Sequence, residues 1–179
     1  TCLMVNDEVV HCRPRHYRIA DGDLITVDVG LEWNGWQLDT ADSVLAGRPD
    51  DKFIETGRQA LKKAIMAAKP GNRVGNISKI IQEILMRNGF SPVRQYCGHG
   101  IGRQIHEDPQ IPCFLAGPVT NTPLIKPGMA LAIEVMMNEG GWEVVNDSSG
   151  WGARTKDGSR SAQFEHTVLV TSDRPEILT

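Results

Sequence analysis

A β-hairpin near the start of the chain is the sequence feature that most constrains its fold. Residues 24–32 alternate, so that Leu24, Thr26 and Asp28 share one face of a strand and the apolar residues between them share the other. The dipeptide Asn34-Gly35 follows, and it favours the two-residue turn that connects antiparallel strands. We expect a second strand over residues 36–45, paired with the first.

Two helices and two more strands are expected after this hairpin. Residues 50–68 and 74–88 carry apolar side chains at helical spacing, and Pro70-Gly71 and Asn88-Gly89 mark their ends. Residues 129–138 and 162–171 are expected to be strands. Strands, then helices, then strands again are typical of an α+β domain with antiparallel pairs and helices packed on one sheet face. The 179 residues contain no linker, so we expect one domain over residues 1–179.

The composition excludes several classes of function. The chain is 40% hydrophobic and 23% charged, as soluble globular proteins are. Its net charge of −3 provides no broad basic field, which argues against nucleic acid as a partner. No apolar run approaches the ~20 residues that cross a bilayer, and the first residues lack the pattern of a signal peptide. Because the chain opens at Thr1 rather than at a methionine, we expect that it lacks an N-terminal segment.

The cysteines favour a reducing compartment. Their even number is compatible with disulfides, but the chain has no secretion signal and no C-x-x-C pair. Free thiols in the cytoplasm are therefore the preferred interpretation. The four cysteines are Cys2, Cys12, Cys97 and Cys113.

Four acidic residues lie inside segments that are expected to be strands. Asp28 and Asp39 flank the hairpin turn, and pairing of the two strands would bring their carboxylates together. Glu134 and Glu165 each lie among apolar neighbours. Taken singly, each Asp could be a turn or capping residue and each Glu could lie on an edge strand. Four carboxylates at buried positions repel one another and require a cation or shared protons, so the set predicts a metal site.

A glycine-rich segment adds a histidine to this donor set. His99 lies between glycines in residues 96–102, which read YCGHGIG, and we expect a loop here in which the glycines allow close approach of a ligand. A lone histidine is more often a hydrogen-bonded core residue, but His106 follows seven residues later. No Lys-Ser or Lys-Thr follows, which argues against a phosphate site. Four carboxylates and one imidazole suit two hard or borderline divalent ions such as Mn, Fe, Co or Zn.

The motifs resemble those of the methionine aminopeptidases, most closely the bacterial type I form. The resemblance covers nearly the whole chain, from about residue 5 to residue 171, and its motifs occur in the same order. It implies the pita-bread fold, a curved antiparallel β-sheet with helices packed on its outer face. The motifs are VDV (27–29), GWQLDTA (35–41), YCGHGIG (96–102), HEDP (106–109), KPGM (126–129) with IE (133–134), and SAQFEHT (161–167).

The resemblance also implies roles for individual residues. Asp39 and Glu165 would bridge the two ions. Asp28 would bind one of them, and His99 with Glu134 the other. Glu134 would also carry the proton of the attacking water. The residues implied to contact the substrate are His11, His106 and Trp151, although Trp151 could equally be an ordinary core aromatic residue.

The implied activity is removal of the N-terminal methionine from peptides and nascent proteins by a metal-activated water. A cytoplasmic monomer is expected, with no nucleic-acid or membrane partner. The chain departs from the family pattern at Cys12-Arg13-Pro14, at Ile105 and at Val135, and these changes concern the pocket rather than the metal ligands. Two alternatives remain open, namely an Xaa-Pro peptidase of the same fold and a non-catalytic pita-bread module that serves for binding.

Overall fold

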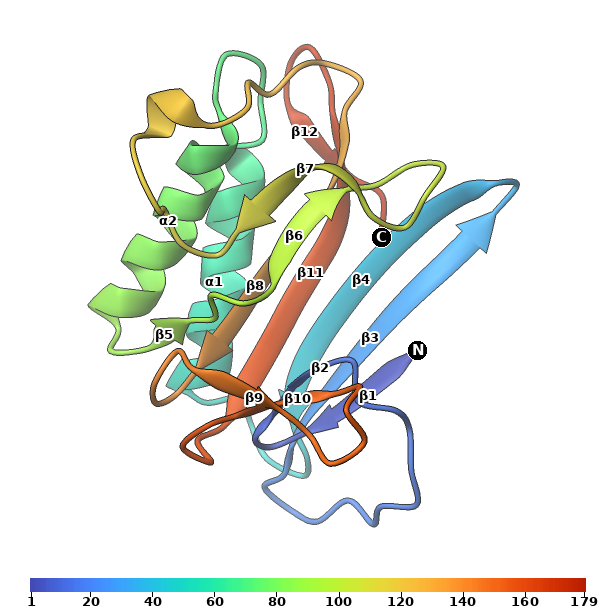
Figure 1. Cartoon of the computed structure of the whole chain (residues 1–179), viewed down its shortest axis with the longest axis vertical. Helices are drawn as coiled ribbons and strands as arrows, with labels where there is room; N and C mark the ends of the chain where they lie inside the picture. The colour runs from blue at the N-terminus through green and yellow to red at the C-terminus, as the bar shows by residue number, and fades with distance from the viewer.

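A large curved sheet and two helices make up most of the molecule, as the computed structural model of residues 1–179 shows (Figure 1). The main sheet has nine strands in the order β1-β3-β4-β11-β8-β6-β7, with β12 paired to β11 and β5 paired to β8. Its strands are β1 (Cys2–Val5), β3 (Leu24–Trp33), β4 (Trp36–Leu45), β5 (Ser91–Pro92), β6 (Cys97–Gly100), β7 (Glu107–Pro112), β8 (Ala130–Asn138), β11 (Ser161–Val170) and β12 (Pro175–Ile177).

A second, three-stranded sheet lies beside β1 and contains β2 (Glu8–Val10), β10 (Ala153–Thr155) and β9 (Val144–Asn146), in that order. A short 3-10 helix, η1 (Val119–Asn121), lies in the connection between β7 and β8. The α-helices are α1 (Lys52–Met66) and α2 (Val74–Arg87), and neither has the length and hydropathy needed to cross a membrane.

The predicted hairpin is confirmed. Strands β3 and β4 pair along their whole length, with Leu24 opposite Leu45 and Trp33 opposite Trp36. The turn residues Asn34 and Gly35 have φ angles of 51° and 75°. Positive φ at both positions is the requirement of the tight hairpin turn, which Asn-Gly meets at little steric cost.

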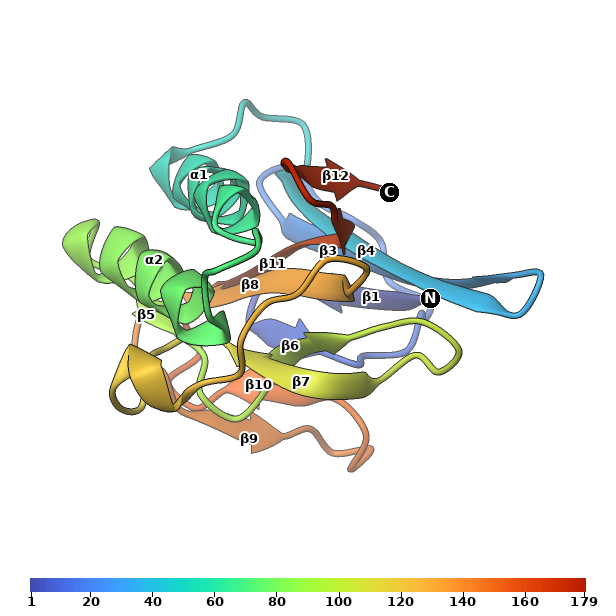
Figure 2. The ribbon, with the colours of Figure 1, turned by 90° about the horizontal axis from the view of Figure 1, so that it is seen from above.

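Both predicted helices form and pack on one face of the sheet. Asp51 caps α1, because its carboxylate accepts hydrogen bonds from the backbone N–H groups of Phe53 and Ile54. The apolar stripe of α1 faces β8 and β11, that of α2 packs against α1, β5 and β7, and both join a core of 29 buried residues. Figure 2, a view from above, shows the two helices side by side over this half of the sheet.

The helices leave the other half of the outer face open. Val27 and Leu31 are 41% and 53% exposed, so the apolar face expected for this strand is only partly buried. Val44, on the neighbouring strand, is 45% exposed. A cavity of about 650 Å³ lies between this part of the sheet and α1. Helices therefore cover the outer face over β8 and β11 but not over β3 and β4.

The glycine-rich segment, which we expected to be a loop, contains a strand. Cys97–Gly100 forms β6, which pairs with β7 on one side and β8 on the other. The glycines serve close packing of backbones: a Cβ on Gly98 would lie 2.5 Å from the carbonyl oxygen of Ala132, and one on Gly100 would lie 2.1 Å from that of Asp108. The expectation of a loop was wrong because glycine is usually rare in strands. The reason for glycine here is the close approach of the neighbouring strands, which the sequence alone does not reveal.

Candidate metal centre

A cavity of about 190 Å³ on the concave side of the sheet brings together the chemically distinctive residues of the chain. All five predicted ligands and both predicted substrate-contacting histidines line it. The lining residues are Val10, His11, Asp28, Asp39, Gln95, Tyr96, Cys97, His99, His106, Glu134, Met136, Gln163 and Glu165.

The hairpin positions the two aspartates. Asp28 lies opposite Ala41, and Asp39 lies opposite Gly30, so the two carboxylates occupy the same face of the β3–β4 pair two residues apart along each strand. Gly30 lies beside the Asp39 carboxylate, since a Cβ there would lie 4.0 Å from Asp39 Oδ1. The alternation of the sequence and the turn position were sufficient to predict this arrangement.

The two glutamates face each other across neighbouring strands. Glu165 of β11 pairs directly with Glu134 of β8, and Glu165 also lies opposite Ala41 of β4. The residues are 2% and 6% exposed, respectively. Two carboxylates directly opposite each other in a buried position are destabilising unless protons or a cation compensate them.

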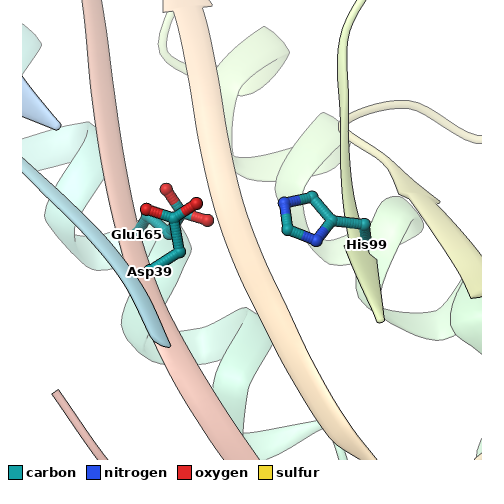
Figure 3. A group of neighbouring side chains, drawn as sticks. All are labelled: Asp39, His99 and Glu165. Atoms are coloured by element: carbon teal, nitrogen blue, oxygen red, sulfur yellow. The ribbon is translucent and has the colours of Figure 1, made fainter. Parts of the chain in front are cut away.

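His99 approaches from β6, where it pairs with Ala132 of β8. Its Nδ1 lies 2.9 Å from the carbonyl oxygen of Gly100. Because a carbonyl only accepts, Nδ1 donates this hydrogen bond and the neutral ring keeps its lone pair on Nε2. Donor atoms of Asp39, His99 and Glu165 all lie within 4.8 Å of one another. Figure 3 shows the imidazole directed across the cavity towards the two carboxylates.

The electrostatics of the cavity disfavour four simultaneous negative charges. Burial, with a further contribution from Asp39, raises the pKa of Asp28 to about 7. Burial and the neighbouring aspartates raise the pKa of Glu134 to about 8. Burial and Glu134 raise the pKa of Glu165 well above its usual value, and burial lowers the pKa of His99. No lysine or arginine lines the cavity, so a bound cation would compensate these carboxylates.

The donor set fits such a cation. Glu165 Oε1 is buried and has no hydrogen-bond partner in the protein, although buried carboxylate oxygens are normally paired. Four carboxylates with one neutral imidazole nitrogen are the ligands of hard and borderline divalent ions. The arrangement therefore has the composition of a divalent metal centre rather than of a hydrogen-bonded acid cluster.

Gln163 is a functional residue that we did not single out from the sequence. Its Nε2 donates to Glu134 Oε2 at 3.2 Å and to Glu165 Oε2 at 3.3 Å, and the residue is 3% exposed. One amide thus fixes the orientation of two candidate ligands, as groups hydrogen-bonded to metal ligands commonly do. The signal was available, since Gln163 and Glu165 are two residues apart on one strand and share a face.

The two further histidines stand at the mouth of the cavity. The His106 ring lies 4.4 Å from the His99 ring, edge to face. His11 adopts a positive φ of 62° and packs edge to face against Tyr96 at 5.5 Å. Burial and the neighbouring His106 lower the pKa of His11. Both imidazoles thus lie within reach of a molecule that enters the cavity.

Trp151 does not line this cavity. It is 61% exposed, and the guanidinium of Arg13 lies 5.3 Å from the centre of its ring. The alternative of an ordinary core aromatic residue is wrong, because the side chain is at the surface. Its assignment to a wall of the substrate pocket stays a prediction.

The departures from the family pattern have distinct environments. Val135 is fully buried and belongs to the main hydrophobic core, on the opposite face of β8 from Glu134. Cys12 is buried, and burial with Glu8 nearby raises the pKa of its thiol to about 12. Ile105 lies near the hairpin, with Cδ1 3.5 Å from the position of a Cβ on Gly30. The same Cβ would lie 4.0 Å from Asp39 Oδ1, so Ile105 lies close to Asp39.

Comparisons with known proteins identify the family of this chain. A family model described as metallopeptidase family M24 matches residues 1–172. Methionine aminopeptidase 1 of Bacillus subtilis is 42% identical over 181 residues, a match that covers 99% of this chain and 72% of the relative. The structure of methionine aminopeptidase from Thermotoga maritima superposes with a TM-score of 0.95 at 44% identity, over 99% of this chain and 72% of that one.

A more distant structure shares the fold alone. The prolidase of Pyrococcus horikoshii superposes with a TM-score of 0.76 at 22% identity, over 99% of this chain and 46% of that one. The fold is therefore the pita-bread fold, as the resemblance implied. The chain belongs to metallopeptidase family M24.

Proposed function

We propose that this chain is a metal-dependent aminopeptidase that removes the N-terminal methionine from peptides and nascent proteins. The single observation that carries the proposal is the cavity in which Asp28, Asp39, His99, Glu134 and Glu165 converge. The similarity to proteins named methionine aminopeptidase supports the choice of substrate. Residues 1–179 would act as one catalytic domain, as a monomer in the cytoplasm.

Two divalent ions, of Mn, Fe, Co or Zn, are the proposed cofactors. Asp39 and Glu165 would be shared between them, Asp28 would serve one ion, and His99 with Glu134 the other. The proximity of Asp39, Glu165 and His99, with donor atoms within 4.8 Å, supports one ion held by these three residues. When bound, such ions polarise a peptide carbonyl and lower the pKa of a bound water molecule towards neutrality.

Glu134 is the proposed proton carrier of the reaction. As a carboxylate that lines the cavity, Glu134 can accept a proton from a water molecule there and release it again. A proton taken from water would thus pass to the amine of the departing peptide.

The two histidines at the cavity mouth would orient the substrate. His106 lies beside His99 and would donate a hydrogen bond to the oxygen that becomes negative as the carbonyl is attacked. His11, held against Tyr96, would bind the amide that follows the first residue. Ile105 and Trp151 are the proposed determinants of methionine selectivity.

Peptide cleavage by the purified protein tests this proposal. After treatment with a chelator and reconstitution with Mn, Fe, Co or Zn, we expect release of methionine from Met-Ala-Ser and no cleavage of Xaa-Pro peptides. Glu165→Gln should abolish turnover and reduce the amount of metal bound, whereas Glu176→Gln, an exposed residue of β12, should change neither. Preferential cleavage of Xaa-Pro peptides would assign the chain to the alternative peptidase class. Failure to cleave either peptide, with or without added metal, would indicate a binding module.

A further inference from the structure

The segment that follows His11 carries a concentration of positive charge that the proposed reaction does not use. Residues 13–18 read Arg-Pro-Arg-His-Tyr-Arg, and all six are exposed. We name Arg13, Arg15, His16 and Arg18 the basic rim. It contrasts with the chain as a whole, whose net charge is −3.

The basic rim begins at the edge of the cavity. The carbonyl oxygen of Cys12 accepts a hydrogen bond from the N–H of Leu3 at 2.9 Å, which fixes the start of the segment against β1. In β1, the neighbouring residue Cys2 pairs directly with Asp28. The segment therefore runs from His11, at the candidate metal centre, to the free edge of β1 at Cys12. Arg13 follows directly after Cys12.

One arginine of the rim has a structural role. Arg15 forms an ion pair with Glu8 at 2.9 Å, and Glu8 is only 3% exposed. A second cation, Arg154, also pairs with Glu8, at 2.7 Å. Because this buried carboxylate is fully compensated, Arg15 anchors the segment to the small sheet and contributes little free charge.

The other two arginines are free of carboxylate partners. Neither Arg13 nor Arg18 has an acidic oxygen within 4.0 Å, and Arg13 instead lies 5.3 Å over the exposed ring of Trp151. The acidic groups nearby are already occupied. Asp23 accepts hydrogen bonds from Tyr17 and the Ala20 N–H, and Asp147, close to Cys12, accepts from Ser149.

The opposite side of the mouth has a different charge. There the half-buried Glu107 and the exposed Asp108 follow His106 and outnumber one exposed cation, Arg103, whose guanidinium lies 3.9 Å over the ring of Trp36. An acidic peptide segment that leaves the cavity would be repelled from this side and attracted to the side of Arg13 and Arg18. The mouth is thus electrostatically asymmetric.

We infer that the basic rim binds acidic side chains of the substrate downstream of the cleaved bond, so that this chain prefers polypeptides with Asp or Glu shortly after the second residue. The inference rests on the proposed function, because it takes the amino terminus of the substrate to lie in the cavity. An extended peptide advances about 3.3–3.6 Å per residue, and Arg13 lies two residues after the cavity-lining His11, so substrate residues shortly after the cleaved bond would meet the rim from its Arg13 end. Arg13 and Arg18 supply the charge, and Trp151 supports Arg13.

Peptide pairs that differ only in downstream charge test this inference. We would compare Met-Gly-Ser-Glu-Glu-Glu with Met-Gly-Ser-Gln-Gln-Gln, at low salt and at 0.5 M NaCl. Exposed ion pairs are weak and are screened by salt, so we expect a KM about three- to tenfold lower for the acidic peptide, a similar kcat, and loss of the difference at high salt.

Variants separate the rim from a general effect of charge. In the double variant Arg13→Gln/Arg18→Gln, the KM ratio of the two peptides should fall to about one. The matched control Arg87→Gln/Arg174→Gln removes the same charge from two exposed positions on α2 and beside β12, and it should keep the ratio of the unmodified protein. An acidic preference that persists in the rim variant, or that is absent from the unmodified protein, would overturn the inference.

A binding measurement makes the result independent of turnover. Fluorescence anisotropy of the labelled acidic peptide measures its binding even if no metal supports cleavage. In that case the proposed function fails, but weaker binding by the rim variant than by the unmodified protein still supports the inference. Cleavage of both peptides at equal KM would preserve the function and reject the rim. Tighter binding of a single-stranded RNA of equal charge than of the acidic peptide would also reject the assignment to a peptide partner.

Discussion

Glu134 and Glu165 lie directly opposite each other in adjacent strands, and the side-chain amide of Gln163 donates to both. Like charges in this position would separate the strands if they were not compensated. The pairing therefore requires that bound protons or a cation compensate the two carboxylates on this face. Gln163 holds one oxygen of each glutamate and leaves the other oxygen for a ligand.

Replacement of Gln163 should weaken metal binding without unfolding the protein. Gln163→Met keeps the approximate volume and removes the donor, and loss of such outer-shell partners typically reduces metal affinity about 10- to 100-fold. Isothermal titration of the apoprotein with Mn or Co measures the change directly. Gln110→Met, at an exposed position of β7, is the matched control. An unchanged Kd in Gln163→Met would contradict the positioning role.

The apoprotein should lose stability as the pH rises from 6.5 to 8. Asp28 and Glu134 have pKa values raised to about 7 and about 8 by burial, whereas both titrate near 4 in the unfolded chain. In this window the folded state binds more protons than the unfolded state, so the free energy of unfolding falls by up to ~1.4 kcal/mol per pH unit for each extra proton bound. Below about pH 6.5, the lowered pKa values of His11 and His99 act in the opposite direction.

Chemical denaturation of the chelator-treated protein at several pH values measures this slope. Glu134→Gln should reduce the slope, since an amide does not titrate. Asp173→Asn, an exposed residue after β11, should leave it unchanged. A flat profile between pH 6.5 and 8 in the unmodified apoprotein would mean that the carboxylates are already ionised without metal.

Metal should stabilise the protein more at pH 8 than at pH 6.5. Divalent ions bind the deprotonated carboxylates, so binding releases protons and the apparent affinity rises with pH. At a free metal concentration of 100 times Kd, the stabilisation is about 2.7 kcal/mol, and it disappears on addition of a chelator. Thermal melts with and without Mn at the two pH values test this expectation. A larger shift at pH 6.5 would indicate a site of neutral ligands.

Gly98→Ala should destabilise the protein and displace His99. The added methyl group would lie 2.5 Å from the carbonyl oxygen of Ala132, so β6 would have to move away from β8. Overpacking of this kind costs about 1–3 kcal/mol, and the shift of β6 should weaken metal binding as well. Gly117→Ala is the control, because a methyl group there meets nothing within 4 Å. Equal stability of the two variants, measured by urea denaturation, would contradict the packing role of Gly98.

Turnover should depend on His106 while metal content does not. His106→Ala removes the imidazole beside His99 without removing one of the five candidate ligands. We expect kcat to fall by about 10²–10³, the usual effect of losing one donor to a developing oxyanion, with an unchanged amount of bound metal. Loss of metal together with activity would assign His106 to the metal centre instead.

The sequence predicted the elements whose patterns are local. The hairpin followed from period-two alternation and Asn34-Gly35, and both helices followed from apolar spacing and their terminal residues. Short strands such as β2 and β10 were not predicted, because three residues carry no detectable period. The strand at His99 was mistaken for a loop, since its glycines make sense only beside β7 and β8.

The candidate ligands were predictable for a related reason. Each of the four carboxylates interrupts an apolar strand, and such a local conflict marks a functional position. Gln163 caused no such conflict, because a buried amide is less conspicuous than a buried charge. The partial exposure of β3 was also hidden, since its apolar residues do not reveal which part of the sheet the helices cover.

Anomalous diffraction from crystals of the Mn-loaded protein would locate the bound ions. We expect two metal peaks about 3.5–4 Å apart inside the cavity, with Asp39 and Glu165 next to both, Asp28 next to one, and His99 with Glu134 next to the other. Peaks outside this cavity, or none within reach of His99, would contradict the assignment of these five residues as a dinuclear metal centre.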